Sequence, residues 1–160
     1  MEKCPKVEAT INLLPRCKKM SAPYIPKSKS DKWMTPPEVY DPLNKEFKFN
    51  CDPCPITWKP NDADGLTMNW GSRTFVNPPY SAVAKWIKKA HDEAALGKTV
   101  VMLINAITDT KAFHEYIYNK AEVRFVRGRI KFINPEAPEK RTPNVKASMI
   151  VVWRPKPKTG

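Results

Sequence analysis

The sequence lacks several features that define large classes of proteins. It has no run of apolar residues long enough to span a bilayer, and its N-terminus does not have the pattern of a signal peptide. We therefore expect no membrane partner and an intracellular, cytoplasmic location. Acidic residues are also few: 16 Asp and Glu against 28 Lys and Arg give a formal net charge of +12. This balance favours a polyanionic partner, most simply nucleic acid.

Metal ligands are scarce as well, with four cysteines and two histidines in 160 residues. Only Cys51 and Cys54 have a metal-like spacing, and no second close pair or nearby histidine completes a site. His91 and His114 both fall in segments that we predict to be helical. The sequence therefore predicts no metal site and cysteines that stay reduced.

Composition divides the chain into an arm, one domain and a short tail. Residues 1–30 are basic and interrupted by prolines, so we expect an arm that either follows phosphate groups or only keeps the chain soluble. Residues 31–155 are long enough for one domain with its own core, and residues 156–160 form the tail.

Apolar periodicity predicts alternating helices and strands within that domain, as in an α/β fold. Thr35 followed by Glu38 is a capping-box pattern at the start of the first helix, and Ser81 and then Thr108 or Asp109 are the expected caps of the others. Helices are predicted over residues 36–46, 81–96 and 110–120, strands over 47–52, 74–76, 98–104, 121–126, 129–133 and 147–153, and loops over 53–73 and 134–146.

The segment Asn77-Pro78-Pro79-Tyr80 follows directly after a predicted strand, and its prolines prevent that strand from continuing. In an open α/β sheet, ligands bind at the carboxyl ends of strands. The Asn77 side-chain oxygen and the Pro78 carbonyl are two close acceptors that could hold both hydrogens of an exocyclic amino group, while Tyr80 could stack on the ring. The alternative is that Asn77 caps a turn and the prolines only end the strand.

Asn-Pro-Pro-Tyr is a signature of amino-group methyltransferases, and further segments of this chain resemble the phage-type DNA N-6-adenine methyltransferases, a Dam-like family. The additional matches are Trp33-x-Thr35-Pro36, Cys51-Asp52-Pro53-Cys54, Asp64-Gly65-Leu66 followed by Trp70, residues 109–114 and residues 128–132. The resemblance implies a small Rossmann-like methyltransferase sheet, mostly parallel with a terminal antiparallel hairpin and with helices on both faces. It also implies S-adenosylmethionine-dependent, adenine-specific methylation of double-stranded DNA by base flipping and direct methyl transfer, as in phage and restriction-modification enzymes.

The resemblance also implies roles for individual residues. Thr35 and the N–H groups of the helix start would meet the cofactor's carboxylate, Asp52 its amine, and Asp64, with Asp62 in reserve, its adenosyl part. The catalytic candidates are Asn77, Pro78, Pro79 and Tyr80; the cofactor candidates are Trp33, Thr35, Asp52, Pro53, Cys54 and Asp64; and the nucleic-acid candidates are Arg127, Arg129, Lys131, Lys140 and Arg141. Basic residues on an edge strand can also serve only to discourage aggregation.

The chain departs from methyltransferase patterns in two places. The usual Gly-rich loop after the first strand is absent, and Ile107 stands where the family is expected to have an arginine. These departures favour one alternative, a catalytically inactive methyltransferase fold that binds DNA. Two others stay open beside adenine methylation of DNA: an amino methyltransferase acting on RNA, cytosine or protein glutamine, and a purely structural protein.

Overall fold

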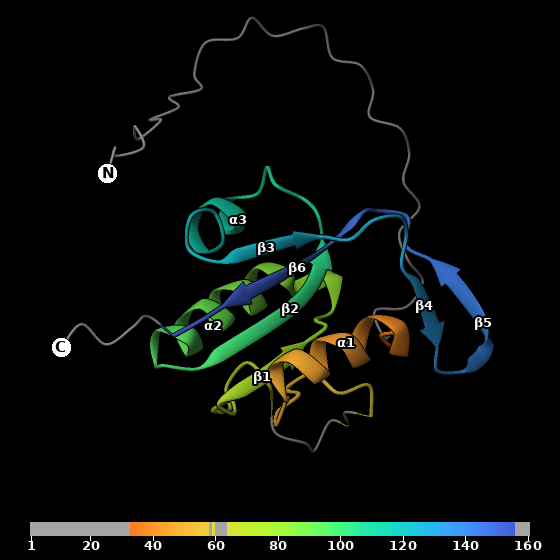
Figure 1. The fold of residues 1–160 in the computed structure, drawn as a ribbon, viewed down its shortest axis with the longest axis horizontal. Coiled ribbons are helices and arrows are strands. Elements are labelled where there is room, and N and C mark those ends of the chain that lie inside the picture. Colours follow the sequence, from red (N-terminus) through yellow and green to blue (C-terminus); the bar gives the residue numbers. More distant parts are fainter. Residues whose placement is uncertain (1–32, 58, 60–63, 156–160) are drawn as a thin grey trace, which may run out of the picture.

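A four-stranded sheet in the order β1-β2-β6-β3 forms the centre of the molecule (Figure 1). The computed structural model describes residues 33–57, 59 and 64–155. The predicted arm at residues 1–30, the tail at residues 156–160 and the reserve candidate Asp62 lie outside the described residues. The described chain therefore comprises most of the predicted domain and the surroundings of its candidate site.

Strand direction differs from the prediction. The strands are β1 (Arg73–Val76), β2 (Thr99–Asn105), β3 (Glu122–Phe125) and β6 (Ser148–Trp153). β1 and β2 are parallel, but β6 is antiparallel to both of its neighbours, β2 and β3. Two of the three strand pairs in this sheet are thus antiparallel, and the prediction of a mostly parallel sheet was wrong. A parallel neighbour needs a long crossover such as the helix between β1 and β2, whereas β6 enters the sheet from the opposite end. Apolar content alone carries no information on that direction.

Strand β2 separates the two halves of the core. Val100, Met102 and Ile104 belong to one buried cluster, while Val101 and Leu103 belong to the other. Successive side chains of a strand point to opposite faces, so a strand that is covered on both sides must be apolar throughout. The nearly continuous apolar run at residues 98–104 predicted this buried strand, and the structure confirms it.

Helices cover both faces of the sheet, as expected (Figure 1). α2 (Val83–Ala95) and α3 (Lys111–Tyr116) pack on one face, and α1 (Pro37–Phe47) packs on the other. A short 3-10 turn, η1 (Tyr80–Ala82), leads into α2. The apolar side of α2 carries Trp86, Ile87 and Ala90 into the core, and Gly97 with φ +92° follows its end, as the sequence predicted.

The helix caps are not those that the sequence indicated. α1 and α2 have no side-chain cap, so the predictions for Thr35 and Ser81 were wrong. The cap of α3 is Thr110, whose hydroxyl accepts from the N–H of Phe113 at 3.2 Å, instead of Thr108 or Asp109. α3 also ends at Tyr116, four residues before its predicted end at Lys120. The next residue, Ile117, is buried in the core, and residues 117–120 form a turn instead of continuing the helix.

The predicted strand at residues 47–52 is reduced to a single bridge. α1 extends through Phe47, which is buried, and Lys48 adopts a left-handed conformation with φ 55°. Only Cys51 pairs with β1, in a parallel bridge to Thr74. The segment still lies along the outer edge of β1, because the N–H of Phe75 donates to the Cys51 carbonyl at 3.0 Å.

The predicted loop at residues 134–146 is mostly a strand. β5 (Ala137–Pro143) pairs antiparallel with β4 (Lys131–Asn134), with a register shift at the end of β4. The β4–β5 hairpin is a separate two-stranded sheet beside the start of α1 (Figure 1). It is not the terminal hairpin that the sequence indicated, because β5 was predicted to be a loop, and the predicted strands at residues 121–126 and 147–153 instead pair with each other in the main sheet as β3 and β6. No residue of β5 is fully buried. A strand without a buried face needs no alternation of apolar and polar residues, and the sequence of β5 has none from which to predict a strand.

Two further observations concern the described residues only. None of their helices is long and apolar enough to cross a membrane. The same residues contain no cluster of three or more His, Cys, Asp or Glu side chains arranged to hold a metal ion.

Candidate active site

A cavity of about 450 Å³ opens at the carboxyl end of β1. Its walls come from segments far apart in the sequence: the stretch before α1 with the first turns of that helix, the turn after the Cys51 bridge, the turn at Asp64, the end of β1, and α2. The lining residues are Trp33, Met34, Thr35, Tyr40, Asp52, Pro53, Cys54, Pro55, Ile56, Asp64, Gly65, Phe75, Asn77, Pro79 and Trp86. The position is the one at which ligands bind in open α/β sheets.

This cavity brings together most of the predicted site. All six cofactor candidates line it: Trp33, Thr35, Asp52, Pro53, Cys54 and Asp64. Of the catalytic candidates, Asn77 and Pro79 line it, whereas Pro78 is buried beside it and Tyr80 is half-buried at the start of η1. The sequence therefore identified residues that share one cavity, and their individual roles remain predictions.

The orientation of the Asn77 side chain is fixed by two hydrogen bonds. Its Nδ2 donates to the backbone carbonyl of Trp33 at 3.1 Å and to Oγ1 of Thr35 at 3.1 Å. A carbonyl can only accept, so the nitrogen must be the atom that faces Trp33. The side-chain oxygen of Asn77 is thus left as an acceptor, with no donor among the described residues.

Asp52 is a carboxylate held in a partly dry environment. Its Oδ1 accepts from the N–H of Cys54 at 3.0 Å, and burial raises the pKa of this carboxyl although that hydrogen bond lowers it. Burial, together with the Asp52 charge, raises the pKa of the Cys54 thiol to about 11. Cys54 therefore remains a neutral thiol at neutral pH and is a wall of the cavity instead of a nucleophile.

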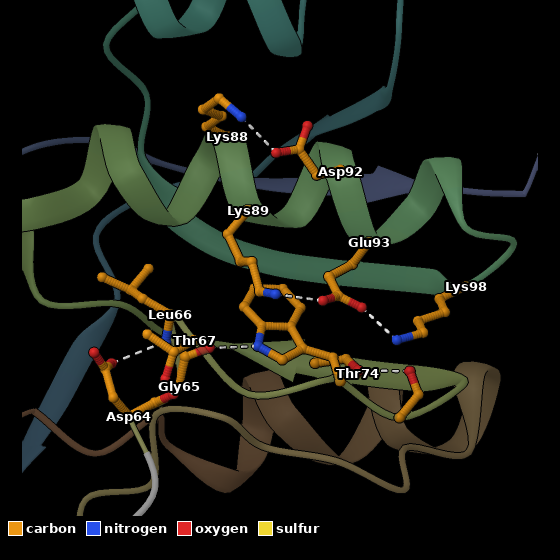
Figure 2. A network of polar contacts seen from close by, with 12 residues as sticks. Asp64, Gly65, Leu66, Thr67, Thr74, Lys88, Lys89, Asp92, Glu93 and Lys98 are labelled. Atoms are coloured by element: carbon orange, nitrogen blue, oxygen red, sulfur yellow. Dashed lines mark hydrogen bonds and ion pairs between the residues drawn. The ribbon is translucent and has the colours of Figure 1, made fainter.

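Asp64 begins a tight turn whose shape is set by its own hydrogen bonds. Its Oδ1 accepts from the N–H of Leu66 at 2.9 Å (Figure 2). Its carbonyl accepts from the N–H groups of Thr67 and Met68, each at 2.9 Å. The indole N–H of Trp70 donates to the next carbonyl, that of Gly65, at 2.7 Å. The turn uses Oδ1 of Asp64 as a hydrogen-bond acceptor, and Oδ2 remains available to a ligand in the cavity.

The start of α1 offers fewer donors than the sequence suggested. Pro36 and Pro37 carry no N–H, and the N–H groups of Val39 and Tyr40 both donate to the carbonyl of Pro36, at 3.0 and 3.1 Å. Glu38 has the one other N–H in this first turn. The expected set of several free N–H groups for a carboxylate is therefore not present.

Several residues of the site were missed by the sequence analysis. Tyr40, Phe75 and Trp86 line the cavity with aromatic rings, and none of them was among the predicted site residues. Burial raises the pKa of Tyr80, and a hydrogen bond with the Asn144 side chain partly opposes this. Asn144 lay in a predicted loop, and no sequence signal distinguished it from an ordinary turn residue.

The basic candidates lie on and beside the β4–β5 hairpin. Arg127, Arg129, Lys131 and Lys140 are exposed, as a nucleic-acid contact requires. Arg141 is also exposed but forms an ion pair with Glu38 at the start of α1. The hairpin is joined to the cavity through Met34, which pairs with Ile133 of β4.

Comparison with known proteins identifies the family. The profile described as "DNA N-6-adenine-methyltransferase (Dam)" matches residues 23–159. A curated DNA N-6-adenine-methyltransferase of Haemophilus phage HP1 (strain HP1c1) is 34% identical over 142 residues, covering 81% of this chain and 82% of the relative. One from Escherichia phage T1 is 26% identical over 170 residues, covering 88% and 71%. No solved structure matches the chain.

These matches confirm the resemblance on which the sequence analysis relied. Adenine-specific methylation of DNA, with S-adenosylmethionine as the methyl donor, follows from the family. The chain belongs to the DNA N-6-adenine-methyltransferase (Dam) family.

Proposed function

We propose that the cavity at the end of β1 is the site of this reaction, and that the target is an adenine turned out of double-stranded DNA. The observation that carries the proposal is the position of Asn77. Its amide lies in the cavity wall with both N–H groups directed to residues 33 and 35, so its oxygen is an oriented acceptor.

The chemistry of the cavity fits the cofactor. A volume of about 450 Å³ lies within the range of roughly 300–1,000 Å³ for small-molecule sites. Tyr40, Phe75 and Trp86 offer flat apolar surface for a ring system, while Asp52 and Asp64 offer carboxylate oxygens for an amine and for hydroxyl groups. When bound, S-adenosylmethionine supplies an electrophilic methyl group.

The residues after β1 prepare the amino nitrogen for attack. The lone pair of an adenine amino group is delocalised into the ring, which makes the nitrogen a poor nucleophile. Oδ1 of Asn77 and the carbonyl oxygen of Pro78 accept its two hydrogens and favour the pyramidal nitrogen that attacks. Preorganised acceptors of this kind stabilise a transition state without rearranging during the reaction. The mechanism needs no protein base. The N–C bond would form as the C–S bond of the donor breaks, the thioether product would leave, and the methylated nitrogen, now cationic and strongly acidic, would lose its proton to water.

The ring of Tyr80 holds the base by stacking. It is half-buried at the start of η1, directly after Pro79. A base inside a duplex is out of reach of such a site, and the target must therefore rotate out of the helix. The basic side chains on and beside the β4–β5 hairpin supply phosphate contacts to the flanking duplex.

The proposal is tested with labelled S-adenosylmethionine and unmethylated duplex DNA, followed by nucleoside analysis. We expect N6-methyladenine from the unsubstituted protein, and less product from single-stranded DNA or RNA of the same sequence. Asn77→Ala should abolish transfer while cofactor affinity is retained, and Asn69→Ala, at an exposed asparagine, should leave transfer unchanged. Near-normal turnover by Asn77→Ala would refute the catalytic assignment.

A further inference from the structure

We infer that Thr35 is a positioning residue for the reaction: its hydroxyl fixes the direction in which the Asn77 amide presents its oxygen. The inference rests on the role proposed above for Asn77. It differs from the role in cofactor binding expected for Thr35, because the hydroxyl acts through another side chain and not on the cofactor.

The amide geometry supports this assignment. Both N–H groups of Nδ2 are used, one on the Trp33 carbonyl and one on Thr35 Oγ1, each at 3.1 Å. A single acceptor would leave the amide free to pivot about one bond, whereas two acceptors define its plane. Turning the amide over would place its oxygen against the Trp33 carbonyl, so the carbonyl excludes the flipped orientation and Thr35 fixes the plane.

The hydroxyl of Thr35 has no competing structural task in the helix. Its sequence pattern predicts a capping box, in which the hydroxyl would accept from a backbone N–H of the first turn. α1 has no side-chain cap, so the N–H of Glu38, which a capping box would use, does not donate to Thr35. The N–H groups of Val39 and Tyr40 donate to the Pro36 carbonyl instead. The acceptor is therefore committed to Asn77. Because Thr is β-branched, its side chain has few rotamers available to release that contact.

The segment that carries Thr35 is itself held firmly. The N–H of Met34 donates to the Ile133 carbonyl at 3.0 Å, and the N–H of Ile133 donates to the Met34 carbonyl at 3.1 Å. On the other side, Pro36 and Pro37 restrict the backbone where α1 begins. A main-chain clamp to β4 thus lies directly between the two groups that hold Asn77. This is the arrangement expected of a support for a reacting group.

The test compares Thr35→Val with Thr35→Ser. Valine keeps the shape but removes the acceptor, and serine keeps the acceptor. We expect Thr35→Val to lower the single-turnover rate of methyl transfer about tenfold, as loss of one orienting hydrogen bond implies. The dissociation constant of S-adenosylmethionine, measured by calorimetry, should change less than threefold. Thr35→Ser should recover most of the lost rate.

Other outcomes overturn the inference. An unchanged rate in Thr35→Val would do so, as would weaker cofactor binding with an unchanged rate at saturation, which would make Thr35 a cofactor ligand. Thermal unfolding of each variant checks the fold, and Thr35→Ala replaces the valine variant if that variant is unstable. Asn77→Ala separates the two proposals: if it is inactive while Thr35→Val is normal, only the role of Thr35 fails, whereas an active Asn77→Ala refutes the proposed function.

Discussion

The indole nitrogen of Trp70 donates a hydrogen bond of 2.7 Å to the carbonyl oxygen of Gly65. Trp70 is buried, stacks on Trp86 with ring centroids 6.1 Å apart, and has the Lys89 ammonium 5.8 Å from its ring centroid. The turn that carries Asp64 is therefore supported from the core by an aromatic pair. The position of Asp64 in the cavity wall therefore depends on this aromatic pair as well as on the hydrogen bonds within the turn.

Replacing Gly65 by alanine should damage the cavity. An added Cβ would lie 2.0 Å from the carbonyl oxygen of Pro53 and 2.7 Å from the ring of Trp86, and neither neighbour is the end of a flexible side chain. We expect Gly65→Ala to weaken S-adenosylmethionine binding at least tenfold, measured by calorimetry, and to lower the melting temperature.

The matched control for that variant is Gly97→Ala. Gly97 has φ +92° but nothing within 4 Å of the added Cβ. This variant should cost roughly 1 kcal/mol of stability, because an L-residue is strained in a left-handed conformation. Its cofactor affinity should be unchanged. Unchanged affinity in Gly65→Ala would mean that the turn can move away from Pro53 without loss.

Glu93 should be the most stabilising carboxylate of α2. It is 2% exposed and pairs with Lys89 at 2.5 Å and with Lys98 (Figure 2). We expect Glu93→Gln to lower the free energy of unfolding by about 2 kcal/mol, because it leaves two partly buried ammonium groups without their counter-charge. Chemical denaturation at pH 7 measures this difference. Asp92→Asn, which removes an exposed pair with Lys88, should leave the midpoint unchanged.

The Glu93 contribution should depend on pH. Burial acts to raise the pKa of this carboxyl, but the hydrogen bonds and charges of Lys89 and Lys98 outweigh it and hold the pKa below 4.5. A lowered folded-state pKa contributes stability that is present above the unfolded value and is lost as the pH falls through the folded one. The difference between parent and Glu93→Gln should therefore shrink below about pH 4.5. A constant difference down to pH 3 would contradict the assignment.

Cofactor affinity should depend on the charge of Asp52. Burial raises the pKa of this carboxyl above 3.8, and the N–H of Cys54 only partly offsets the effect. If Asp52 holds the cofactor's amine, affinity should fall as the pH drops through that raised pKa. Asp52→Asn should weaken binding about 10- to 100-fold at pH 7 and flatten the pH profile. Asp41→Asn, an exposed change on α1, is the control. Equal pH profiles in parent and Asp52→Asn would exclude the role.

Affinity for DNA should be limited by the ion pair between Glu38 and Arg141. Glu38→Gln releases the guanidinium, so we expect duplex affinity to rise about threefold at low salt, measured by fluorescence anisotropy. Glu139→Gln changes the net charge equally on the exposed face of β5 and should have a smaller effect. Equal effects of the two variants would show that only net charge matters and that Arg141 makes no contact with DNA.

The site could be predicted further than the fold. Short runs such as Asn77-Pro78-Pro79-Tyr80 carry chemistry that needs those residue types in that order, so their grouping at the cavity was within reach of the sequence. The exposed β5 was not, because it has no apolar alternation and forms through backbone pairing with β4. The prediction that Thr35 caps α1 was wrong for a related reason. Its capping pattern is local, whereas its partner is Asn77, 42 residues away.

Strand β6 has a consequence for how the protein is made. It lies between β2 and β3 and supplies the neighbour that each of them needs on that side. While residues 148–153 are still inside the ribosome, β2 has one open edge of apolar main chain and β3 has no partner in the sheet. The emerging chain is thus vulnerable to aggregation until β6 has left the ribosome. Activity should therefore appear abruptly once β6 can enter the sheet, with no gradual rise as the domain lengthens.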